Sequence, residues 1–85
     1  MPKVILNKKV VKTLKHFGVY DEFITQMKLQ WVGRGDGYTQ AEIDGLTAGQ
    51  LVMYLINWRV DTVAGAHWWQ SMYTRINSYE ANAED

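Results

Sequence analysis

The chain has 85 residues, one Pro, no Cys and a formal net charge of zero. This length permits one domain with a small core, and the 47% of apolar residues, with four Trp and five Tyr, indicates a folded chain. The lack of Cys excludes a disulfide framework, a thiolate zinc site and a Cys nucleophile. We therefore expect one globular domain over residues 1–85.

The charges are distributed unevenly along the chain. Residues 1–36 hold seven Lys or Arg and three acids, whereas residues 37–85 hold two Arg and six acids. This charge asymmetry would orient a partner or favour head-to-tail self-association. Alternatively, the basic and acidic halves attract each other within the fold.

The apolar runs are short. The N-terminal segment has a run of three residues and the longest run, at 51–56, has six. These runs predict neither a signal peptide nor a membrane span, so we expect a cytoplasmic protein without membrane contact.

The first predicted helix spans about Lys8 to Phe17. Asn7 is suited to the N-cap because its side-chain oxygen can accept a first-turn N–H. Gly18 can adopt the left-handed conformation that ends a helix, which would bring Val19 against Leu14. The expected apolar stripe consists of Val11, Leu14 and Phe17, with Val10 beside it.

The second predicted helix spans about Glu22 to Trp31, with Asp21 as its N-cap. Apolar residues recur in it at helical spacing. They are Phe23, Ile24, Met27 and Trp31. A glycine-rich loop is expected to follow at 32–38.

Two capping boxes come next. In a capping box, a Ser or Thr at the N-cap and a Glu or Gln three residues later satisfy each other's backbone donors. Thr39 pairs with Glu42, and Thr47 pairs with Gln50. The predicted helices span about 40–44 and about 48–59. The second of them contains the apolar run at 51–56 and is expected to be the buried, central helix.

The last predicted helix spans about Thr62 to Tyr79, with Asp61 as its cap and a late start if Gly65 weakens its first turn. Its apolar stripe consists of Ala66, Trp69, Met72, Tyr73 and Ile76. Residues 80–85 are expected to be a frayed acidic tail. Together these elements predict an all-α fold, a single small domain of four to five short helices around the central helix at about 48–59.

The glycine-rich loop resembles several short binding motifs. Residues 34–36 form the tripeptide Arg-Gly-Asp, whose adhesion function requires a secreted protein. An EF-hand alignment would place Val32 and Arg34 where oxygen ligands are needed. A phosphate-binding loop would follow a strand, whereas a helix is predicted before this one. We expect an exposed turn whose Arg34 and Asp36 form the rim of a partner-binding surface.

Residues for catalysis or metal binding are scarce. His16 and His67 lie far apart in the sequence, and no Ser/His/Asp arrangement is evident. His16 is expected to be exposed, and His67 is expected to pack beside the neighbouring tryptophans. We expect a protein that is not an enzyme and uses no cofactor or metal.

Adjacent tryptophans give the main functional hypothesis. Trp68 and Trp69 would point about 100° apart on a helix. If Trp69 is in the core, Trp68 lies at the edge of the apolar stripe. The other expected members of this surface are Met72, Arg75 and Tyr79. These residue types are enriched at binding hot spots, although the same pattern also fits a wide core face. The sequence predicts a protein-interaction module, such as a small regulator or inhibitor.

Segment 41–55 supports an alternative. It has a small residue four before a glycine, a Thr two after it and an apolar residue six after it. These residues are Ala41, Gly45, Thr47 and Leu51. The pattern resembles the helix-turn-helix, which implies a nucleic-acid-binding transcriptional regulator. Val52 and Met53 depart from it, because a recognition helix carries exposed polar residues there. The residues expected to contact nucleic acid are Lys8, Lys9, Lys12, Lys15 and Gln50.

Overall fold

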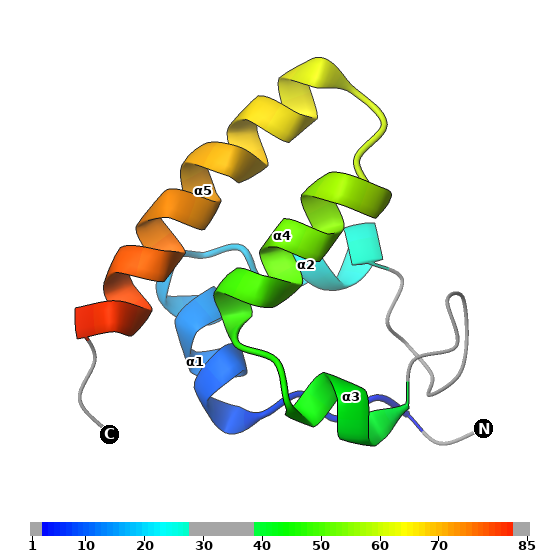
Figure 1. Cartoon of the computed structure of the whole chain (residues 1–85), viewed down its shortest axis with the longest axis vertical. Helices are drawn as coiled ribbons and strands as arrows, with labels where there is room; N and C mark the ends of the chain where they lie inside the picture. The colour runs from blue at the N-terminus through cyan, green and yellow to red at the C-terminus, as the bar shows by residue number, and fades with distance from the viewer. Residues whose placement is uncertain (1–2, 28–38, 83–85) are drawn as a thin grey trace.

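The computed structural model describes residues 3–27 and 39–82, and its elements within these ranges are helices (Figure 1). They are α1 (Lys8–His16), α2 (Tyr20–Met27), α3 (Gln40–Asp44), α4 (Ala48–Trp58) and α5 (Val63–Asn82). The predicted all-α fold is confirmed.

The central position of α4 is also confirmed. This helix packs against α5 along its length and contacts α1 and α2 as well (Figure 1). Leu51, Val52 and Leu55 are fully buried. They join a single hydrophobic cluster to which α1, α2, α3 and α5 also contribute side chains.

Helix α1 begins and ends as the sequence predicts. The Asn7 side chain accepts a hydrogen bond of 2.8 Å from the Lys9 N–H. At the other end, Gly18 has φ +68°. The Val19 N–H donates to the Leu14 carbonyl at 3.0 Å, so the chain reverses direction within two residues of the helix.

The buried face of α1 is rotated from the predicted stripe. Val10, Thr13 and Leu14 are buried, whereas Val11 and Phe17 are only partly buried. Because α1 packs against α2, α4 and α5, its buried face is set by three neighbouring helices and includes a threonine that an apolar pattern does not reveal.

Helix α2 begins earlier than predicted. Its first hydrogen bond runs from the Phe23 N–H to the Val19 carbonyl at 2.8 Å, so the chain passes from the α1 turn directly into α2. Asp21 therefore lies inside the first turn and is not the N-cap. The predicted helix end at Trp31 and the loop at 32–38 lie outside the described residues.

Both predicted capping boxes are present. The Thr39 hydroxyl accepts from the Glu42 N–H at 3.1 Å, and the Glu42 carboxylate accepts from the Thr39 N–H at 3.2 Å. The same exchange joins Thr47 and Gln50 at 3.1 and 2.9 Å. These boxes fix the starts of α3 and α4.

The side chain of Gln40 attaches the N-terminal segment to α3. The Ile5 N–H donates to Gln40 Oε1 at 3.1 Å, and Gln40 Nε2 donates to the Ile5 carbonyl. The Gln40 amide thus satisfies both the N–H and the carbonyl of Ile5, as the backbone of a neighbouring strand would.

The start of α5 differs from the prediction. The Thr62 hydroxyl accepts from the Gly65 N–H at 3.0 Å, so Thr62 acts as the cap in place of Asp61. Gly65 belongs to the helix, and a Cβ at this position would lie 2.8 Å from Thr62 Oγ1. The glycine leaves room for this cap.

The end of α5 also differs. The helix continues to Asn82, so residues 80–82 are not a frayed tail, and 83–85 lie outside the described residues. The Glu80 carboxylate accepts hydrogen bonds from the N–H groups of Ala48 and Gly49 at 3.0 and 2.9 Å. Glu80 therefore caps the first turn of α4 from a different helix.

Candidate functional site

Two adjacent tryptophans of α5 have different surroundings. Trp69 is 6% exposed and belongs to the core, whereas Trp68 is 48% exposed. Their rings meet edge to face at 88°, with centroids 4.9 Å apart. The buried indole therefore holds the exposed one in place, since edge-to-face pairs are favourable.

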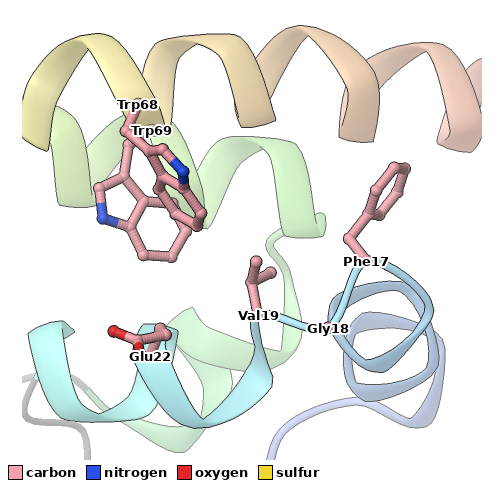
Figure 2. A pocket seen from close by; sticks show the side chains of 6 residues that line it. All are labelled: Phe17, Gly18, Val19, Glu22, Trp68 and Trp69. Carbon is pink, nitrogen blue, oxygen red and sulfur yellow. The ribbon is translucent and has the colours of Figure 1, made fainter.

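These indoles form one wall of a groove. The opposite wall comes from the turn between α1 and α2 and from the first turn of α2. Figure 2 shows the residues that line it, which are Phe17, Gly18, Val19, Glu22, Trp68 and Trp69. We call this feature the tryptophan groove. Its volume is about 530 Å³, and it is open to solvent.

An aromatic cluster contains Phe17, which also lines the tryptophan groove. The Phe17 ring meets the Tyr79 ring edge to face, with centroids 5.6 Å apart. His16 stacks on Tyr79, with centroids 4.5 Å apart. These ring contacts join the C-terminal ends of α1 and α5, and they hold the Phe17 ring in place beside the groove.

The charge at the groove is negative. Glu22 lies in the first turn of α2, where the helix dipole favours an acid, and its carboxylate lies below the indoles in Figure 2. Among the described residues, it has no hydrogen-bond or ion-pair partner, and the groove is lined by no Lys or Arg.

A second hollow shares Gly18 with the tryptophan groove. Its volume is about 380 Å³, and Lys15, Tyr20 and Asp21 complete its lining. Lys15 Nζ lies 5.3 Å from the centre of the Tyr20 ring, so this cation is directed toward the second hollow.

The predicted partner-binding residues are only partly brought together. Trp68 and Arg75 are exposed, and Tyr79 is partly buried. Met72 is 7% exposed, so its prediction as a surface residue is wrong. It lies in the α5 stripe that faces the core, beneath the aromatic surface. Arg34 and Asp36 lie outside the described residues.

The groove also contains residues that the sequence did not indicate. Phe17, Val19 and Glu22 precede the tryptophans by most of the chain's length, and only the packing of α1, α2 and α5 brings them opposite Trp68. His67, expected to pack, is exposed, whereas His16 is exposed as predicted.

The residues of the nucleic-acid alternative are distributed over two helices. Lys8, Lys9, Lys12 and Lys15 are all exposed on α1. Gln50 is exposed on α4, but its Oε1 already accepts the Thr47 N–H. Val52 is fully buried, and α4 itself contains no Lys or Arg. Basic charge is therefore available on α1 and not on the helix expected to read bases.

Within 3–27 and 39–82, no three His, Asp or Glu side chains are grouped so that they could hold a metal ion. No helix in this part of the chain has the length and apolar character needed to cross a membrane.

Comparisons with known proteins give no family. No protein-family model matches the chain, and no curated protein or solved structure matches it significantly. The function must therefore be inferred from the geometry of the site.

Proposed function

We propose that this protein is a non-enzymatic interaction module that binds a segment of another protein in the tryptophan groove. The observation that carries the proposal is the position of Trp68, which is 48% exposed while forming a wall of the groove. A partner that covers an exposed indole gains a large apolar contact, and Trp is among the residues that dominate binding energies.

The rigidity of the groove supports the proposal. Trp69 is buried beside Trp68, and Phe17 is held against Tyr79. Gly18 and Val19 are fixed by the hydrogen bonds that end α1. A groove with walls held in this way loses little conformational entropy when a ligand binds.

Selection from a displayed library of random peptides on the immobilised domain tests the proposal. We expect selected peptides to lose about tenfold or more in affinity for Trp68→Ala, because a hot-spot tryptophan supplies at least about 1.4 kcal/mol. Calorimetry or biolayer interferometry measures the two affinities.

Trp58→Ala is the matched control. Trp58 is 70% exposed at the end of α4, and it does not line the groove. Its replacement should leave the affinities unchanged. Peptides that bind Trp68→Ala as well as the wild type, or that depend on Trp58 instead, would contradict the proposal.

The four exposed lysines of α1 favour a second candidate, the binding of nucleic acid through its phosphates. Such binding must weaken steeply with added salt, because each neutralised phosphate releases counterions. A mobility-shift experiment with duplex DNA and with single-stranded RNA at low salt tests it. The second candidate is rejected if neither probe shifts.

A further inference from the structure

We infer that the segment bound by the tryptophan groove presents an arginine, whose guanidinium packs on the Trp68 indole and pairs with Glu22. This inference rests on the proposed function and adds the chemistry of the partner. It commits to an arginine within a protein segment as the occupant.

The first support is the aromatic wall. A cation is attracted to the face of an aromatic ring, and Trp is the strongest such partner. Trp68 is 48% exposed, whereas the Trp69 ring that it meets at 88° is buried. A planar cation could therefore lie against an accessible indole face.

The second support is the unpaired carboxylate. Glu22 lines the same groove as the indoles, and it has no hydrogen-bond or ion-pair partner among the described residues. The nearby cation, Lys15, lines the second hollow and lies over Tyr20. The groove thus has an excess of negative charge that a basic ligand would complement.

The third support is the combination of these surfaces. A guanidinium is planar, so it can stack on an indole while its edge donates to a carboxylate. Its aliphatic stem can lie on apolar surface, which the partly buried Phe17 provides in the rest of the groove. An acidic side chain in the groove would be repelled by Glu22. A purely apolar side chain would desolvate the Glu22 carboxylate without pairing with it.

A pair of peptides tests the inference. The first is the acetylated, amidated pentapeptide Gly-Leu-Arg-Leu-Gly, and the second carries citrulline, which has the same shape without the charge, in place of arginine. Each is titrated into ¹⁵N-labelled protein while the indole N–H signals of Trp68 and Trp69 are followed. We expect the arginine peptide to shift these signals with a several-fold lower dissociation constant than the citrulline peptide.

Two protein variants locate the charge that is responsible. Glu22→Gln should abolish most of the preference for arginine. Asp21→Asn is the matched control, because it removes the same charge from the adjacent residue, which lines the second hollow and not the tryptophan groove. It should retain most of the preference.

The outcomes separate this inference from the proposed function. Equal binding of the two peptides, no binding of either, or an arginine preference that survives Glu22→Gln would overturn the inference. The proposed function would still stand if the peptides selected from the library depend on Trp68. If the affinity of the selected peptides also does not depend on Trp68, both the inference and the proposed function fail.

Discussion

Gly18 sets the direction in which the chain leaves α1 and thereby places Phe17 and Val19 in the groove. Its φ of +68° is unfavourable for a residue with a Cβ, although a Cβ built there would meet no atom within 4 Å. Gly18→Ala should therefore lower the free energy of unfolding by about 1–2 kcal/mol through backbone conformation alone. Urea denaturation measures this difference.

Gly45 supplies the control for that variant. It ends α3 with φ −83°, and its nearest atoms to an added Cβ are carbonyl oxygens at 3.6 and 3.7 Å. Gly45→Ala should leave stability unchanged or raise it slightly, since alanine restricts the unfolded chain. Equal losses in the two variants would show that the left-handed backbone is not the cause.

The tryptophan pair predicts a second contrast between residues. Trp69→Ala should destabilise the domain by about 3–5 kcal/mol, because it opens a cavity in the core. Trp68→Ala should cost about 0.5–1.5 kcal/mol, the value of an edge-to-face aromatic contact. Thermal or urea unfolding distinguishes them. A loss at Trp68 as large as that at Trp69 would mean that Trp68 is a core residue.

At the scale of elements, Glu80 joins the end of α5 to the start of α4. Its carboxylate satisfies two N–H groups of the first turn of α4, which Thr47 and Gln50 do not reach. Glu80→Gln removes one acceptor and the charge while keeping the size of the side chain. We expect a loss of about 1–3 kcal/mol in the free energy of unfolding.

Ser78→Ala controls for changes in helix propensity near the end of α5, because Ser78 is exposed. It should have almost no effect on the urea midpoint. If Glu80→Gln also had almost no effect, water would satisfy the N–H groups at the start of α4 as well as Glu80 does.

The elements that the sequence predicted well are those with local signals. Asn7, the Thr39 box and the Thr47 box each act within three residues, so their helix starts were found correctly. The starts of α2 and α5 were misplaced, because Asp21 and Asp61 are good caps by residue type. The structure uses Val19 and Thr62 there instead.

Features that depend on contacts between distant elements could not be predicted. The hydrogen bonds of Glu80 reach a helix that begins 32 residues earlier. The wall of the groove opposite Trp68 comes from the turn after α1. Periodicity identified the apolar faces of the helices but not which faces meet.

At the scale of the whole molecule, three surfaces formed by residues 3–27 and 39–82 carry residues suited to binding. One is the lysine-bearing surface of α1, and another is the tryptophan groove between α5 and the α1–α2 turn. The third is the end of the α4–α5 pair, where Trp58 and Val63 are 70% and 77% exposed. The location of binding therefore distinguishes between the candidate functions.

The central claim is that partners bind in the tryptophan groove. The most direct test is a chemical-shift map of the ¹⁵N-labelled protein with a peptide selected on the wild-type domain. We predict that the largest changes occur in the backbone amides of residues 17–22 and in the indole N–H of Trp68. Changes centred on Trp58 and Val63, or on the lysines of α1, would contradict the claim.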